Sequence, residues 1–152
     1  MKPSALAFAF VLTALSLTAP AFAAVDLNLT VVKEQRIQAK DGSVSVKLIP
    51  AQSAVPGDRL VYTLRYRNTG KTPAADLVLN YPLPQGVLYR APADGSTAPD
   101  VSVDGKTFAP LGGIMIGNRP ATAEDVTHLR WALKAPVAAG GSGQVAFSAV
   151  LQ

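Results

Sequence analysis

The sequence contains no cysteine and only one histidine, His128. Without cysteine the chain forms no disulfide bond, and it has no thiolate for metal binding or nucleophilic attack. Zinc and copper sites usually draw on several histidine or cysteine ligands, so one histidine is too few for them, and we expect no haem site either. These absences predict a chain without a cofactor and without a metal centre of these kinds.

Hydrolase motifs are equally scarce. A Ser-His-Asp arrangement would depend on His128 alone. The sequence GGSGQ at residues 140–144 is close to the G-x-S-x-G nucleophile motif. However, Gln144 stands where the last glycine belongs, and a predicted strand follows instead of a helix. We therefore expect that the protein is not an enzyme.

Acidic residues do not form a recognisable calcium loop. Asp94, Asp100 and Asp104 fall in the irregular region 91–118, where loop oxygens are potential calcium ligands. Their spacing matches no calcium motif, and two of them belong to Asp-Gly pairs, which are common turn signals. Turns are the favoured interpretation, and a calcium site is the alternative.

Charge of one sign is not concentrated anywhere in the chain. The formal net charge is +4, and the lysines and arginines are scattered. Nucleic-acid-binding proteins carry clustered basic residues, so no nucleic-acid partner is expected. Arg65, Arg67 and Arg90 are candidates for a basic stripe on one sheet face, and a solvated face is favoured over an anion or polysaccharide site.

Long apolar runs are confined to the N-terminus. Residues 5–17 form an uncharged, largely apolar run after Lys2, and the sequence AFA at residues 21–23 has the form of a cleavage site. A membrane-spanning helix needs roughly 20 apolar residues, and Pro20 interrupts the run before that length. We predict a Sec-type signal peptide over residues 1–23, export of the chain, and no transmembrane segment after cleavage.

Alternation of apolar and polar residues is the main pattern in the rest of the chain. Residues 56–86 read PGDRLVYTLRYRNTGKTPAADLVLNYPLPQG, with two alternating segments around an Asn-Thr-Gly turn. Period two predicts half-buried strands. A register slip by one residue would bury arginines, so the register is strongly specified. The predicted core face of the first strand comprises Leu60, Tyr62, Leu64 and Tyr66.

The same alternation predicts further strands. They cover residues 25–32, 44–48, 77–81, 87–89, 101–103, 106–108, 127–134 and 145–151. Residues 33–40 are polar and are expected outside strands, while Pro50 and Pro56 should bracket a sheet edge or a crossing between sheets. This pattern predicts one immunoglobulin-like antiparallel β-sandwich of about seven to nine strands over residues 24–152.

One group of motifs resembles a known bacterial family. Its residues are VPGD at 55–58, Tyr62-Thr63, Asn68-Thr69-Gly70, LPQG at 83–86 and RWAL at 130–133. Their order is similar to that of the conserved repeat domain catalogued as domain of unknown function eleven. The resemblance implies an immunoglobulin-like module of exported or cell-envelope proteins, with no catalytic residue. The chain departs from the family at Pro82, where aspartate is usual, and in holding a single copy.

The motif residues have structural roles in this interpretation. Gly57 and Gly70 should adopt turn conformations that are costly for other residues. Asn68 should close its turn and Asp58 should accept loop N–H groups. Tyr62 or Tyr66 should bury a ring and bond a nearby loop through the hydroxyl. The remaining structural positions are Pro84, Gly86 and Trp131.

The segment LGGIMIG, residues 111–117, is the most apolar part of the irregular region. A buried strand or a plug at one end of the sandwich is the favoured interpretation. The alternative is an exposed apolar lip for a partner, formed by Ile114, Met115 and Ile116.

Three functions remain open at this level. The leading hypothesis is a non-enzymatic module in the periplasm or at the surface of a bacterium that contacts another envelope protein. The second is a structural subunit of a surface fibre, in which residues 25–32 are donated to a neighbour. The third is a carbohydrate-binding or small-ligand-binding module that uses Tyr81, Tyr89 or Trp131.

Overall fold

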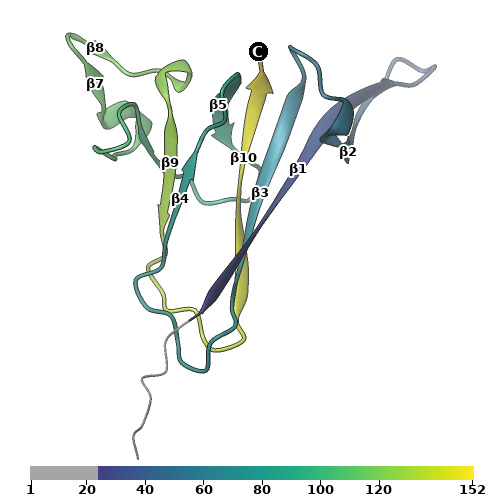
Figure 1. The fold of residues 1–152 in the computed structure, drawn as a ribbon. Helices are drawn as coiled ribbons and strands as arrows, with labels where there is room; N and C mark the ends of the chain where they lie inside the picture. Colours follow the sequence, from purple (N-terminus) through teal and green to yellow (C-terminus); the bar gives the residue numbers. More distant parts are fainter. Residues whose placement is uncertain (1–23) are drawn as a thin grey trace, which may run out of the picture.

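The computed structural model describes residues 24–152, which form two facing antiparallel sheets and one small separate hairpin (Figure 1). The described chain has no α-helix, and its 3-10 helices are η1 Ala51–Ser53, η2 Leu111–Gly113 and η3 Ala123–Asp125. The fold is an immunoglobulin-like antiparallel β-sandwich, so the predicted fold class is confirmed. The predicted signal peptide, residues 1–23, lies outside the described residues.

The larger sheet has five strands in the order β2-β1-β3-β10-β5. The strands are β1 Val25–Gln38, β2 Val44–Pro50, β3 Arg59–Asn68, β5 Val87–Pro92 and β10 Ser142–Leu151. β10 pairs with β3 along nearly its whole length, from Ser142 opposite Arg67 to Val150 opposite Arg59. These paired strands carry alternating buried residues, as the period-two pattern predicted.

The smaller sheet has the order β4-β9-β6. Its strands are β4 Val78–Pro82, β6 Asp100–Ser102 and β9 His128–Ala132, and the separate hairpin consists of β7 Met115–Ile116 and β8 Arg119–Pro120. The strand predicted at residues 106–108 is absent. The carboxylate of Asp104 accepts the backbone N–H groups of Lys106 and Thr107, each at 2.8 Å, so these donors close a turn instead of joining a ladder.

The core is built around Phe147 of β10, which is wholly buried. Its ring stacks on that of Tyr62, with centroids 4.9 Å apart and planes 9° from parallel. The rings of Tyr81, Tyr89 and Trp131 surround it, with centroid distances of 5.6 to 6.2 Å. Since these four rings come from β3, β4, β5 and β9, one side chain joins strands of both sheets.

β1 extends beyond the segment that alternation predicted. Its first part pairs with β3, from Val25 opposite Asn68 to Lys33 opposite Leu60. Residues 33–38 were expected outside strands, and this prediction was wrong, because they continue β1 and pair with β2. Little of this hairpin is buried on either face, so its residues need no apolar period to form a ladder. The hairpin projects from the sandwich, at the right of Figure 1.

The turn motifs mostly behave as their residue types predict. Gly57 has a φ of 93°, in the region that favours glycine, and Gly86 has a φ of 78°. Gly70 does not have a positive φ, so the expectation of a special conformation there was wrong. The turn is held instead by Asn68, whose Oδ1 accepts the Gly70 N–H at 3.0 Å.

Candidate functional site

The three residues predicted as an apolar lip do not share one environment. Ile114 is only 6% exposed and belongs to the core, while Ile116 is half-buried and packs against the same core. Met115 is 58% exposed on the short β7–β8 hairpin. Ile114 and Ile116 therefore pack on the core while Met115 is exposed, so the three side chains do not form one apolar lip.

The aromatic residues considered for ligand binding lie inside the sandwich. Tyr89 and Trp131 are buried, and the half-buried Tyr81 packs against Phe147. Trp131 donates its indole N–H to the carbonyl oxygen of Thr97 at 2.9 Å, which satisfies its one polar atom. These side chains hold the sheets together and present no stacking platform for a sugar.

One of the three aspartates considered for calcium, Asp104, has its carboxylate engaged in local hydrogen bonds. Residues 24–152 contain no cluster of three or more histidine, aspartate or glutamate side chains that could hold a metal ion. The Asp104 carboxylate is occupied by the N–H groups of Thr107 and Lys106 and by the Ser102 hydroxyl, at 2.8 Å each. These bonds lower the pKa of Asp104 to about 2. Asp104 therefore acts as a turn acceptor.

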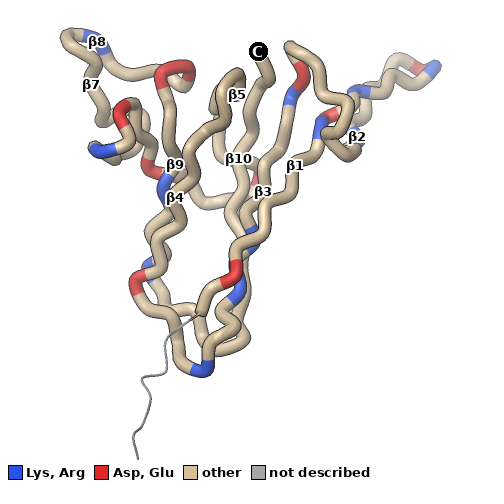
Figure 2. Tube along the Cα trace, viewed as in Figure 1, with Lys and Arg blue, Asp and Glu red and all other residues tan. Residues whose placement is uncertain are grey.

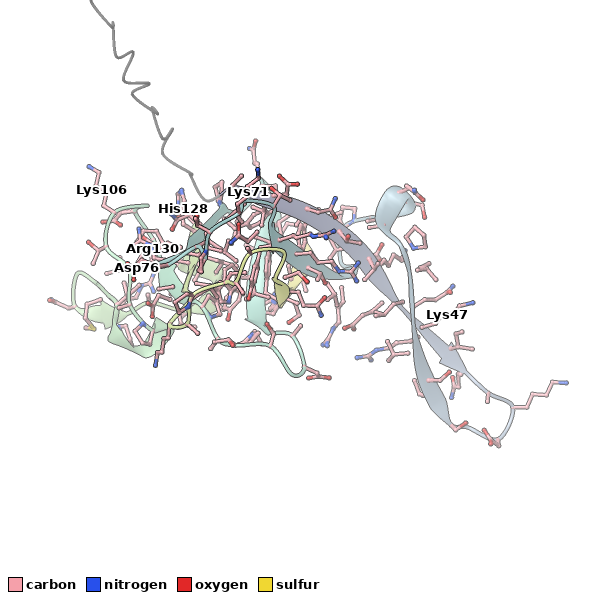
Figure 3. The ribbon with its side chains drawn as sticks, turned by 90° about the horizontal axis from the view of Figure 1, so that it is seen from below. Lys47, Lys71, Asp76, Lys106, His128 and Arg130 are labelled. Carbon is pink, nitrogen blue, oxygen red and sulfur yellow. The ribbon has the colours of Figure 1, made fainter. Side chains whose placement is uncertain are left out.

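His128 lies on the outer side of β9, with Arg130 two residues on (Figure 3). Its Nδ1 is 2.9 Å from the Thr127 hydroxyl oxygen, and its ring packs closely over Gly105. Trp131 faces the opposite way, into the core, as the alternation predicted. The contacts of His128 are those of a surface strand residue that covers a turn.

The three arginines of the predicted basic stripe lie in two separate places on the larger sheet. Arg65 and Arg67 lie on the outer face of β3, beside a hollow of about 830 Å³ that Asp26 and Gln144 also line. The Arg65 Nε donates to the Gln144 Oε1 at 3.3 Å. Arg90 lies on β5 and pairs with Glu124 instead. Positive and negative residues occur along the whole trace, without segregation (Figure 2).

Exposed apolar side chains are concentrated in and around the projecting β1–β2 hairpin. Val44, Val46 and Leu48 of β2 are 60%, 56% and 56% exposed, and we call these three residues the β2 row. The other large exposed apolar residues of β1 and of the loop before β3 are Leu27, Leu29, Ile37 and Val55. Monomeric proteins seldom expose contiguous apolar surface of this kind, so the row is the best candidate for a binding surface.

The β2 row arises from simple alternation on a strand that nothing covers. Val44, Val46 and Leu48 are spaced by two, so their side chains point to the same face of the sheet. Ser45 and Lys47 point to the other face, and Figure 3 shows Lys47 on the part of the hairpin that extends away from the sandwich. β2 pairs only with β1, so its outer edge has no partner in the described chain.

A groove runs along one side of the β2 row. It has a volume of about 680 Å³, and it lies over the outer face of the larger sheet, between the hairpin and β5. Val46 and Leu48 form one wall, while Val61, Val150 and Pro92 contribute to the rest. The row thus continues into a mixed floor, in which these apolar side chains lie among the charged residues Glu34, Arg59, Arg90 and Asp94.

A local ion pair fixes the base of the hairpin. The Asp58 Oδ2 accepts the Val55 N–H at 2.7 Å, as predicted for this motif residue, and lies 2.7 Å from the Lys33 Nζ. The Lys33 ammonium and the Val55 N–H lower the pKa of the Asp58 carboxyl. Lys33 occupies the position where β1 passes from β3 to β2, so this pair connects the hairpin to the loop before β3.

Part of this surface could be predicted from the sequence. The alternation of residues 44–48 and the prediction of an edge near Pro50 are both confirmed. Pro50 ends β2, where a missing N–H removes no bond to a neighbouring strand. What the sequence did not reveal is that the apolar side chains of this strand lie on the outer face of the larger sheet, opposite to the face that packs against the smaller sheet.

Comparisons of the chain with protein-family models, curated proteins and solved structures found no match. Among residues 24–152, no helix combines the length and hydropathy required to cross a membrane.

Proposed function

We propose that this chain is an exported, non-enzymatic β-sandwich module that works through contact with another protein in the bacterial cell envelope. The observation that carries the proposal is the β2 row, whose three apolar side chains are each more than half exposed on a strand with an open edge. Open edges and exposed apolar rows favour association with a further strand. The sandwich holds this surface away from its own core.

The sequence supports the location in this proposal. The N-terminal residues have the charge, apolar run and AFA cleavage site of a Sec signal peptide. A chain without cysteine has to be stabilised in an oxidising compartment by its core alone, and the aromatic cluster around Phe147 provides such a core. The resemblance of residues 56–89 to the conserved repeat domain supports the same assignment to the envelope.

The second candidate is a subunit of a surface fibre, and one observation favours it. The first part of β1 pairs with β3 on one side, while β2 covers only residues 32–38 on the other. Residues 25–31 therefore leave a second open edge, next to the exposed Leu27 and Leu29. Since these residues already form a strand of their own sheet, a fibre contact would use this segment as an acceptor rather than as a donated strand.

Site-specific photo-crosslinking in cells that export the protein tests the leading proposal. A photoreactive residue in place of Val44 or Leu48 should give covalent adducts with a protein in the envelope. The matched control replaces Lys106, an exposed residue at the opposite end of the molecule in Figure 3. Adducts that are equally frequent at all three positions, or absent from Val44 and Leu48, would overturn the proposal.

A further inference from the structure

The outer edge of β2 offers a defined set of free backbone groups. The Ala39 N–H donates to the Ser43 carbonyl oxygen at 2.8 Å, at the closed end of the β1–β2 hairpin. In an antiparallel ladder, hydrogen-bonded pairs recur at every second residue. Counting from this bond, the next such pair is Ile37 with Ser45, so the N–H and C=O groups of Ser45 and Lys47 point toward β1.

The groups that point outward therefore belong to the β2 row. The N–H and C=O groups of Val44, Val46 and Leu48 lie on the unpaired side of the strand. The pairing of β1 with β3 gives the same result independently. The Thr69 N–H donates to the Ala24 carbonyl oxygen at 2.7 Å, which directs the odd-numbered residues of β1 toward β2.

The residue pattern of β2 fits a second copy of itself. If two β2 strands pair antiparallel around a two-fold axis at Val46, each Val46 faces its own copy and each Val44 faces Leu48 of the other strand. All side chains of the β2 row then meet apolar partners. The outward N–H groups of the row meet outward C=O groups in the same register, so the backbone ladder is complete.

The two neighbouring registers bring less favourable side chains opposite each other. An axis at Lys47 would place the two ammonium groups directly opposite each other, in a pair whose Cα atoms are only about 4.5 Å apart. Like charges in that position are destabilising. An axis at Ser45 would leave Leu48 opposite Gly42 of the second copy, without an apolar partner. The axis at Val46 avoids both problems, because it places each Lys47 opposite Ser45.

The hairpin is accessible to such a partner. It extends away from the two sheets in Figures 1 and 3. Every residue from Val44 to Leu48 is exposed, and the chain leaves this edge at Pro50, whose lack of an N–H ends the ladder beyond Leu48. A two-fold contact of this type is isologous and closes on itself, so it yields dimers.

We propose that the β2 edge pairs with the β2 edge of a second copy of this chain, around a two-fold axis at Val46. The two five-stranded sheets would then form one continuous sheet of ten strands. This inference rests on the proposed function and names the partner at the hairpin. A contact made by one strand from each copy is small, so the dimer should depend on protein concentration.

Disulfide trapping in the purified, cysteine-free protein tests the register. A hydrogen-bonded antiparallel pair has Cα atoms about 5.5 Å apart, within the range of about 4.4–6.8 Å that a disulfide requires. Val46→Cys should therefore form a covalent dimer under mild oxidation. Val44→Cys is the matched control, because it is equally exposed, yet it should lie about 13 Å from its own copy, four residues along the strand.

A mixture of Val44→Cys and Leu48→Cys chains adds a second readout of the register. These two positions face each other in the proposed dimer, so the mixture should form a disulfide that neither variant forms alone. This mixture still tests the register if Val46→Cys does not fold, and circular dichroism would show whether Val46→Cys folds. A disulfide between Val46→Cys and Leu48→Cys chains instead would place the axis at Lys47 and overturn the proposed register.

Sedimentation equilibrium of the unmodified protein completes the experiment. The average mass should rise toward twice the monomer mass with concentration, and Val46→Lys should remove this rise. Gln38→Lys should keep it, since Gln38 lies on the same face of β1 but off the open edge. A monomer at all concentrations and no excess of Val46→Cys dimer would overturn the self-pairing. Hairpin adducts with a different protein in cells would then still support the proposed function, whereas their absence would overturn both.

Discussion

The Lys33 Nζ lies 2.7 Å from the Asp58 Oδ2, at the position where β1 leaves β3 and begins to pair with β2. The same carboxylate oxygen accepts the Val55 N–H, so one aspartate holds both the strand and the loop at the base of the hairpin. The orientation of the β2 row relative to the sandwich therefore depends on a side chain outside the row itself.

Asp58→Ala should loosen the base of the hairpin, because it removes both the ion pair and the acceptor of the Val55 N–H. We expect a lower melting temperature and faster amide exchange in residues 33–50, with little change around Phe147. Asp58→Asn keeps an oxygen acceptor but loses the charge, so its effect should be smaller. Equal exchange in the hairpin of Asp58→Ala and of the unmodified protein would contradict this role.

Phe147→Ala should be among the most damaging single changes in the chain. The Phe147 ring contacts aromatic rings from four strands, and truncation of a buried phenylalanine costs about 3–5 kcal/mol. Native domains are stable by only about 5–15 kcal/mol, so much of the free energy of unfolding would be lost. Urea unfolding measures this loss, and the exposed Met115→Ala is the control that should leave the midpoint nearly unchanged.

Asn68→Asp tests the one buried amide that organises the turn after β3. Its Nδ2 donates to the Thr72 and Val137 carbonyl oxygens at 2.8 and 2.9 Å, and a carboxylate can donate to neither. Each buried group left unpaired costs about 1–3 kcal/mol, so we expect a loss of several kcal/mol in urea unfolding. Asn118→Ala is the control, because Asn118 is exposed in the turn between β7 and β8 and its loss should cost less than about 0.5 kcal/mol.

Gly143→Ala should destabilise the end of the ladder between β10 and β3. Gly143 of β10 is paired with Tyr66 of β3, and an added Cβ would overlap the tyrosine ring and hydroxyl. Overpacking of this kind costs about 1–3 kcal/mol in the free energy of unfolding. Adding Tyr66→Ala should relieve the overlap, so the double variant should lose less than the sum of the single variants. Gly112→Ala, where an added Cβ meets open space, should be almost neutral.

Asp104 should make part of the stability acid-sensitive. Its pKa is about 2 in the folded chain because of bonds from Thr107, Lys106 and Ser102, and near 3.8 when those bonds are absent. A carboxylate with a lowered folded pKa contributes its stability above the unfolded pKa and loses it as pH falls through the folded pKa. The stability advantage over Asp104→Asn should therefore shrink from about pH 4 to pH 2. A difference in unfolding free energy that is constant over this range would contradict this assignment.

The parts of the fold that could be predicted are those in which burial imposes a pattern. β3 and β10 lie between other strands with one face on the core, so Tyr62, Leu64 and Phe147 recur at period two. Asp58 and Asn68 could also be assigned, because the bonds they make are to residues nearby in the sequence.

The parts that could not be predicted depend on distant neighbours. Residues 33–38 form a strand because β2 folds back beside them, and their polar composition carries no period that reveals it. An apolar segment such as residues 111–117 reads the same whether it is covered or not, and only the packing shows that Ile114 is in the core. The β2 row is the opposite case, in which the expected alternation was correct and the covering layer is absent from the described chain.

The change of partners along β1 determines how the molecule carries a mechanical load. A pull on the hairpin tip is transmitted along β1 into the ladder that joins Val25–Lys33 to β3. Antiparallel hydrogen bonds run perpendicular to the strands, so tension along β1 shears many of them together and does not peel them apart one by one. β3 passes the load to β10 through an equally long ladder. Tension applied at the hairpin is thus resisted by a whole ladder at once, rather than by one hydrogen bond after another.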